Sequence, residues 1–292
     1  AVKIAPHYAA GTIHVVDASK SVPVVSSLLS AERREEVLSF VREEYQEIRE
    51  EFENNTARAN YLSLEAARAN AFKIDWSAYK PTTPRAMGIT ALNDFPLDEL
   101  ARRIDWSPFF QAWELKGKFP DILNSPTVGK EAKSLFEDAN ILLGRIVREK
   151  LITASGVFGL FPACRVGHDD IELCLDDNRR EPIAKFRMLR QQAEKREGQP
   201  NLSLADFIAP VGSGTDDYMG LFAVTAGLGA GSLAEQFEKE NDDYQAIMVK
   251  ALADRLAEAF AELIHERVRK EYWGYAADEN ISNEDMLKER FQ

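Results

Sequence analysis

The stretch from Asp242 to Tyr275 constrains the fold most, because it predicts one long, half-buried helix. It contains neither Gly nor Pro before Gly274, and it is rich in Ala, Leu, Glu and Arg, which favour helices. Its apolar side chains recur at helical spacing and predict a buried stripe of Met248, Leu252, Leu256, Ala259, Phe260 and Leu263. The rest of the chain must therefore supply an apolar surface that covers this stripe.

The same helix carries a second stripe, which is acidic. Its members stand four residues apart and therefore share one face: Asp254, Glu258, Glu262 and Glu266. Like charges at this spacing destabilise a helix by roughly 0.2–0.5 kcal/mol per pair, and the nearby Lys and Arg residues offset only part of that repulsion. A cationic ligand or a partner would give the carboxylates a function; the alternative is a solvated acidic face.

The charge of the chain limits its partners. The 292 residues carry a formal net charge of -12, which repels phosphate backbones and anionic membranes, so we expect no nucleic-acid or membrane partner. No apolar run approaches the roughly 20 residues that span a bilayer. The two cysteines, Cys164 and Cys174, are too few for a disulfide framework, so we expect reduced thiols and a cytoplasmic protein.

The order of the predicted elements indicates an α+β fold. Helices are predicted from Ser30 to about Phe52, from Ser63 to Ala69 and from Thr127 to about Lys150, and capping boxes at Ser232/Glu235 and Ser282/Asp285 open two more. Strand-like runs cover residues 12–17, 157–161, 171–175, 183–189 and 218–224. Short polar turns favour an antiparallel meander. With no repeat and no low-complexity linker, we expect a single domain.

Two short motifs suggest chemistry that the sequence does not otherwise support. Gly227–Gly231 lies between a strand and a helix, but its spacing is not that of a dinucleotide loop, so a flexible joint is the better interpretation. His168–Asp170 is explained by a hairpin turn, and no further His stands at ligand spacing, so we expect no metal. The scattered histidines and the absence of a Gly-x-Ser-x-Gly elbow give no catalytic nucleophile.

Asp105 stands in an unusually aromatic segment, between residues 104 and 113. Trp106, Phe109, Phe110 and Trp113 surround it in sequence. A carboxylate beside such rings can bind an ammonium or a sulfonium by charge and by cation–π attraction. The alternative is a cap on a buried helix. Asp105 and Glu258 both suit a small cationic ligand that carries an amine.

Long runs of this chain resemble one family from end to end. They are Ile104–Phe110, Gly159–Ala163, Leu189–Gln192, Leu204–Pro210, Ile247–Glu262 and His265–Arg269. They resemble the activation domain of cobalamin-dependent methionine synthase, the C-terminal module that binds S-adenosylmethionine. The resemblance implies a single curved α+β domain over residues 1–292, with a twisted antiparallel meander sheet flanked by long helices. Residues 1–11 resemble the linker that follows the cobalamin module.

The resemblance also implies a function. The parent enzyme is a methyltransferase that makes methionine from homocysteine, with a methyl group carried by cobalamin from methyltetrahydrofolate. When the cobalt is oxidised, the activation domain presents S-adenosylmethionine to the cobalamin module, and flavodoxin or a diflavin reductase supplies an electron. We therefore expect S-adenosylmethionine and cobalamin as cofactors, the latter held by another module, and no turnover by the isolated domain.

Four site residues follow from the resemblance by position. Asp105 matches the residue that binds the methionyl amine, and Glu258 matches one at the ligand and module interface. Asp254 and Arg255 match residues that meet the cobalamin module once its histidine has left the cobalt.

The chain departs from the family at its end. After the position of Gln292, the family continues into an Arg-Pro-Ala-Pro-Gly-Tyr loop that supplies much of the ligand site, so we expect a C-terminal truncation. A docking domain that binds no ligand of its own is the main alternative function. A free-standing methyltransferase of the Rossmann type is a further one, and it requires a parallel sheet.

Overall fold

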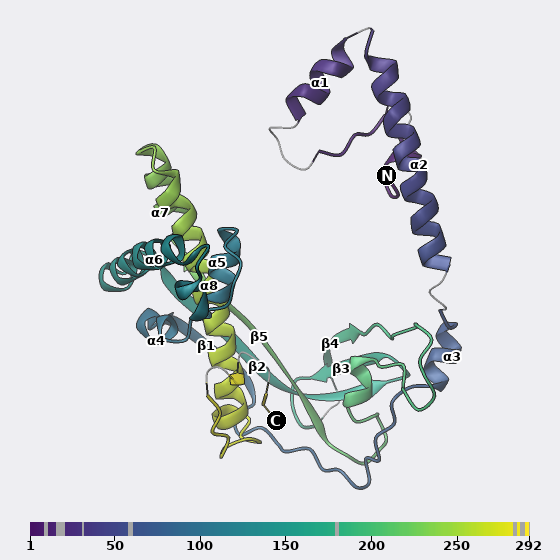
Figure 1. Cartoon of the computed structure of the whole chain (residues 1–292). Coiled ribbons are helices and arrows are strands. Elements are labelled where there is room, and N and C mark those ends of the chain that lie inside the picture. The colour runs from purple at the N-terminus through teal and green to yellow at the C-terminus, as the bar shows by residue number, and fades with distance from the viewer. Residues whose placement is uncertain are drawn as a thin grey trace. The chain divides into compact units, whose positions relative to one another are not determined.

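The contacts within the chain divide it into two compact units, which are described separately (Figure 1). The computed structural model describes residues 1–8, 11–15, 21–30, 32–57, 61–178, 181–282, 285–286 and 290–291. The first unit comprises Ala1–Phe72 and Leu189–Ser203, and the second comprises Lys73–Met188 and Leu204–Gln292. The expectation of one domain with a linker at residues 1–11 stays a prediction; residues 9, 10 and 292 lie outside the described residues.

The first unit is built on helices. They are α1 (Ser21–Leu29), α2 (Arg34–Ala57) and α3 (Leu64–Ala69). Ser63 begins α3 as predicted, because its hydroxyl accepts a hydrogen bond from the Ala66 amide at 3.1 Å. The strand expected at residues 12–17 is wrong over residues 12–15, which have no regular structure, and residues 16 and 17 lie outside the described part.

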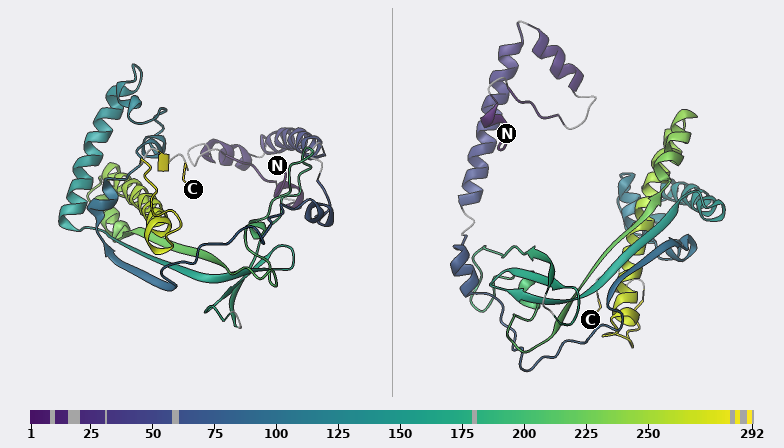
Figure 2. Two further views of the ribbon diagram at one scale, coloured as in Figure 1. Left: turned by 90° about the horizontal axis from the view of Figure 1, so that it is seen from below. Right: turned by 180° about the vertical axis from the view of Figure 1, so that it is seen from behind.

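The second unit contains a five-stranded sheet in which every described pairing is antiparallel. The central strand is β2 (Thr153–Val166). β5 (Asp217–Leu228) pairs along one edge of β2, and β1 (Gly88–Phe95) and β3 (Asp170–Cys174) share the other edge, while β4 (Pro182–Arg187) pairs with β3. This confirms the predicted α+β class and is incompatible with a Rossmann-type sheet. The sheet curves strongly, as Figure 2 shows.

The sheet differs from a simple meander in two ways. β5 returns to the central strand, so that Phe222 lies opposite Phe158, instead of adding to the edge at β4. β1 was not predicted, because its sequence, Gly-Ile-Thr-Ala-Leu-Asn-Asp-Phe, has few β-branched residues and carries two turn formers just before its last residue.

A glycine joint, and no phosphate loop, connects β5 to the next helix. α7 (Ala230–Lys239) begins directly after Gly229, whose φ of +96° favours glycine. The capping box predicted at Ser232 and Glu235 is therefore wrong, since both residues already lie inside the helix. The box at Ser282 and Asp285 is confirmed, because the Ser282 hydroxyl accepts from the Asp285 amide at 3.1 Å.

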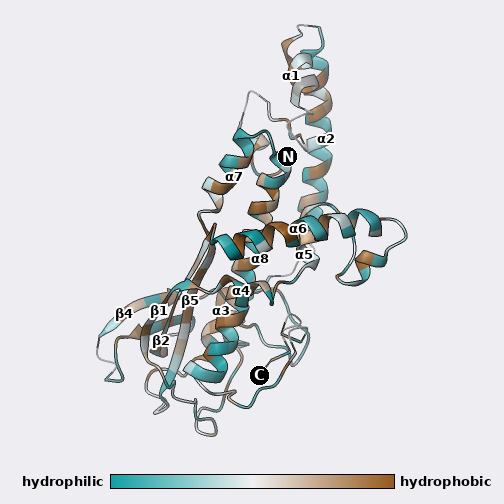
Figure 3. Ribbon diagram, turned by 90° about the vertical axis from the view of Figure 1, so that its left-hand side faces the viewer, coloured by the Kyte–Doolittle hydropathy of each residue, from teal (hydrophilic) through white to brown (hydrophobic). Residues whose placement is uncertain are grey.

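Helices pack on one another and on the sheet around α8 (Asp243–Arg267). The others are α4 (Leu97–Ala101), α5 (Ser107–Ala112) and α6 (Gly129–Glu149). α8 begins where the Asp242 carboxylate accepts a hydrogen bond from the Gln245 amide at 3.0 Å. Its predicted apolar stripe is buried, and Figure 3 shows brown residues alternating with teal ones along the helix. Gly156 of β2 allows this close packing, because a Cβ there would come within 2.9 Å of the Phe260 ring.

Within the part of the chain that the structure describes, no helix is both long and apolar enough to cross a membrane. Cys164 and Cys174 are not joined by a disulfide.

Candidate functional site

The acidic stripe on α8 divides into an exposed and a partly buried half. Asp254 and Glu258 are exposed, whereas Glu262 and Glu266 are partly covered. The alternative prediction of a solvated acidic face therefore fits only Asp254 and Glu258. Glu262 and Glu266 lie toward the loop that leads from α4 to α5. Because they are partly desolvated, leaving either charge uncompensated costs more free energy than at the surface.

Arg255 compensates the exposed half of the stripe. Its guanidinium lies 2.6 Å from the Asp254 carboxylate and forms a second ion pair with Glu258. Only 12% of the Arg255 side chain is exposed, so its position is fixed by packing as well as by charge. The structure thus brings three of the four predicted site residues together on one surface of α8.

Glu266 is compensated by cations from two elements. Arg103, in the loop after α4, lies 2.6 Å from its carboxylate, and Lys270 lies 3.3 Å away. Burial alone would raise the pKa of Glu266, but these two contacts outweigh it and lower the pKa. The Arg103 ion pair also ties the loop that carries Asp105 to α8.

Asp105 lies in that loop, directly before α5. Its carboxylate accepts a hydrogen bond from the Ser107 amide at 2.9 Å, which closes a turn before the helix. The predicted helix cap at Asp105 is wrong, because Trp106 is the N-cap residue of α5 and makes no side-chain capping bond. Trp106, Phe109 and Phe110 are buried in the main core, so their faces are covered by other core side chains. The charge of Asp105, and not these rings, is therefore what the segment offers to a cation.

Glu262 is close enough to Asp105 and Glu258 for the charges of both to act on it. Burial, and then the negative charges of Glu258 and Asp105, raise its pKa to about 7, against smaller opposing effects of Arg103 and Arg255. Among the described residues, no donor reaches its buried Oε2 atom. Asp105 and Glu258, predicted from different parts of the sequence, therefore act on the same carboxylate.

A cavity of about 280 Å³ opens beside this part of the helix. It is lined by Arg102, Arg103, Glu266, Ile281, Ser282 and Met286. The cavity therefore extends from the loop before Asp105 to the C-terminal segment, and it provides room for a small molecule next to the acidic stripe.

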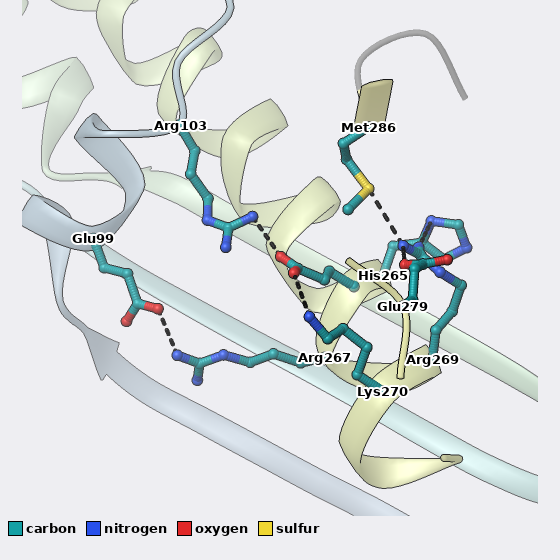
Figure 4. Close-up of polar contacts among 9 residues, drawn as sticks. Glu99, Arg103, His265, Arg267, Arg269, Lys270, Glu279 and Met286 are labelled. Atoms are coloured by element: carbon teal, nitrogen blue, oxygen red, sulfur yellow. Dashed lines mark hydrogen bonds and ion pairs between the residues drawn. The ribbon is translucent and has the colours of Figure 1, made fainter. Parts of the chain in front are cut away.

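The C-terminal end of α8 carries a different charged cluster, which sequence reasoning missed. Arg269 is fully buried in a π-helical turn, Val268–Tyr272. One of its nitrogens donates to the Glu279 carboxylate at 2.5 Å and lies 3.4 Å from the Met286 sulfur, and another lies 2.9 Å from His265 Nδ1 (Figure 4). Burial and the nearby Arg269 charge lower the pKa of His265, so a neutral imidazole accepts this hydrogen bond.

No signal in the sequence distinguishes Arg269 from the exposed cations around it. Its neighbours Arg267 and Lys270 are equally basic and pair at the surface. Among the described residues, no group of His, Cys, Asp and Glu side chains is arranged to hold a metal ion. The acidic stripe with Asp105 is therefore the best candidate site.

This chain is also similar to known proteins. A family model described as "Vitamin B12 dependent methionine synthase, activation domain" matches residues 96–292, which include Asp105 and the whole acidic stripe. A crystal structure of the MetH reactivation domain bound to AdoHcy is similar, with 52% sequence identity and a TM-score of 0.77. That similarity covers 80% of this chain and 70% of the other one.

Proposed function

The chain belongs to the family of activation domains of vitamin B12-dependent methionine synthase, and from this premise we propose that it binds S-adenosylmethionine for reductive reactivation of cobalamin. The observation that carries the proposal is that the charges of Asp105 and Glu258 both act on Glu262, one helical turn from Glu266, which lines a cavity. S-adenosylmethionine has an ammonium and a sulfonium, and clustered carboxylates attract both. A similar domain bound to AdoHcy supports the same ligand class.

The roles of the four predicted residues follow from this arrangement. Asp105 binds the methionyl ammonium, because its charge faces the stripe while one oxygen stays on the Ser107 amide. Glu258, paired with Arg255, lies where the ligand meets the cobalamin module. Asp254 and Arg255 meet the cobalamin module, which fits their place at the exposed end of the stripe.

The reaction is a transfer of the sulfonium methyl group to reduced cobalamin, which another module of the enzyme holds. The task of this chain is to position the donor, because methyl transfer needs alignment more than acid–base chemistry. On this proposal the isolated domain does not turn over. An electron comes from flavodoxin or a diflavin reductase, and the enzyme acts in the cytoplasm.

Calorimetric titration of this chain with S-adenosylmethionine tests the proposal. Asp105→Asn removes the charge but keeps an oxygen that accepts from Ser107, so folding is preserved. Loss of a hydrogen bond to a charged group should weaken binding about 10- to 100-fold. Asp98→Asn is the matched control, because Asp98 lies exposed on α4 and pairs with Arg102.

The wild-type titration separates the two function classes. A saturable heat at micromolar ligand that falls in Asp105→Asn and not in Asp98→Asn supports the proposal. If the folded wild-type chain gives no heat, docking without ligand binding takes its place.

A further inference from the structure

Glu262 is the one acidic-stripe carboxylate with no ion pair to a described residue. Asp254 and Glu258 share Arg255, and Glu266 pairs with Arg103 and Lys270. Glu262 is nevertheless partly buried, and its Oε2 atom is shielded from solvent without a hydrogen-bond donor among the described residues. A desolvated carboxylate in this state is stabilised by any cation that approaches it.

The place of Glu262 on α8, and of the loop that faces it, follows from the helix and from a neighbouring ion pair, independently of any pKa. Glu262 follows Glu258 by one turn on α8 and precedes Glu266 by one turn, so the three carboxylates share one face. The 2.6 Å ion pair between Arg103 and Glu266 fixes the following loop residues against this face. Asp105 is two residues further along that loop, and its own carboxylate is oriented by the Ser107 amide.

We propose that Glu262 faces the sulfonium of bound S-adenosylmethionine and makes this site prefer the methyl donor over its demethylated product. The proposal rests on the function inferred above. Asp105 neutralises the ammonium, which donor and product share. Glu258 is already paired with Arg255, so Glu262 is the carboxylate left for the second positive charge.

The preference follows from what the reaction does to sulfur. When the methyl group leaves, the S–CH₃ bond breaks, its electron pair stays on sulfur, and the cationic sulfonium becomes a neutral thioether. A carboxylate beside that sulfur attracts the donor and gains nothing from the product. Glu262 thereby favours exchange of the spent product for a new donor.

The preference should depend on pH, because Glu262 titrates near neutrality. Glu258 and Asp105 face it with negative charges, and Arg103 and Arg255 with positive ones. A protonated Glu262 cannot compensate the sulfonium. The affinity for the donor should therefore rise as the pH increases from about 6 to about 8, and donor binding should release a proton below about pH 8. The affinity for the product should change little over the same range.

The experiment is calorimetric titration of the wild-type chain and of Glu262→Gln with S-adenosylmethionine and, separately, with S-adenosylhomocysteine. At pH 8, Glu262→Gln should weaken donor binding by about tenfold and product binding by less than about twofold. Titrations in buffers of different ionisation enthalpy at pH 7 should show proton release for the donor in the wild type and none in Glu262→Gln. Glu235→Gln, an exposed change of the same kind on α7, should match the wild type.

The outcomes are distinguishable. Equal weakening of donor and product in Glu262→Gln, or no weakening of either, would overturn the assignment while leaving the proposed function intact. No binding of either ligand by the folded wild type would overturn both. Should Glu262→Gln fail to fold, the pH dependence of the wild-type donor-to-product affinity ratio decides, because a ratio constant from pH 6 to 8 contradicts the proposal.

Discussion

The acidic stripe of α8 and the π-helical turn that follows α8 differ in how their buried charges are compensated. Arg269 is fully buried, and its guanidinium has partners from α8 and from the C-terminal segment: His265, Glu279, Met286 and the ring of Phe291. Glu262, two helical turns earlier, is partly buried, and its shielded Oε2 atom has no hydrogen-bond donor among the described residues. A charge that is satisfied internally holds a fold together, whereas an unsatisfied one is available to a ligand.

The comparison also explains why the two clusters differ in their effect on pKa. Around Arg269 opposite charges meet, because its guanidinium pairs with the Glu279 carboxylate and each charge stabilises the other. Around Glu262 like charges meet, and the pKa rises to about 7 because the charged form is both desolvated and repelled. Strained electrostatics of this kind is common where proteins bind ligands, although ion-pair networks perturb pKa values as well.

Replacing Arg269 should give the largest effect on stability. Arg269→Met leaves the Glu279 carboxylate, whose side chain is only 5% exposed, buried without its 2.5 Å partner. Removing one partner of a buried pair costs about 3–5 kcal/mol of unfolding free energy, measurable by urea denaturation. The donor-to-product affinity ratio of the protein that remains folded should not change, which is how this cluster differs from Glu262.

Two controls sharpen that prediction. Arg102→Met, at a side chain that is 70% exposed, should change stability by less than about 0.5 kcal/mol. Combining Arg269→Met with Glu279→Gln should recover part of the loss, because the carboxylate charge that Arg269 compensated is then removed as well. If Arg269→Met itself cost less than about 1 kcal/mol, the view of this cluster as a structural anchor would be wrong.

The sequence predicts the helix and its two stripes well, because their periodicity is a local property. The apolar stripe from Met248 to Leu263 and the acidic one beside it follow directly from a spacing of 3.6 residues per turn. The hairpin from β2 to β3 is also local, since turn formers join adjacent runs. The antiparallel class of the sheet could therefore be predicted without coordinates.

What failed depends on contacts between distant parts of the chain. β1 is a strand because it pairs with β2 from Gly88 to Phe95, and its own sequence has weak strand propensity. The pairing of β5 with β2 is likewise determined by contacts between residues that are far apart in the sequence. Asp105 and Glu258 could be named as site residues, but the special state of Glu262 results from burial and from Asp105, which lies far away in sequence.

The pH dependence of stability should show a smaller effect, which arises at Glu262. Its folded-state pKa of about 7 lies above the ordinary carboxyl value of 4.5, so between these values the folded chain holds a proton that the unfolded chain has released. The stability that this extra proton gives the folded chain is fully present below the lower pKa, and it is lost as the pH rises through the higher pKa. Relative to Glu262→Gln, the wild type should lose on the order of 1 kcal/mol between about pH 5 and 8, since partial exposure screens the charge.

Urea denaturation of both proteins across this range measures the difference. Glu235→Gln, in which an exposed carboxylate is removed, should keep the wild-type slope. A wild-type chain that gains stability relative to Glu262→Gln as the pH rises would mean that a cation compensates Glu262 after all.

The smallest effect should come from the ion pair between Arg267 and Glu99. Its geometry resembles that of the buried cluster, with 2.5 Å between the charged atoms, but the side chains are 28% and 30% exposed. Partly solvated pairs contribute about 0.2–1 kcal/mol, and salt screens them. A double-mutant cycle of Arg267→Gln and Glu99→Gln should therefore give a coupling below about 1 kcal/mol that falls further in high salt. A coupling as large as that of Arg269 and Glu279 would show that short distance, and not burial, separates the structural charges of α8 from those left for a ligand.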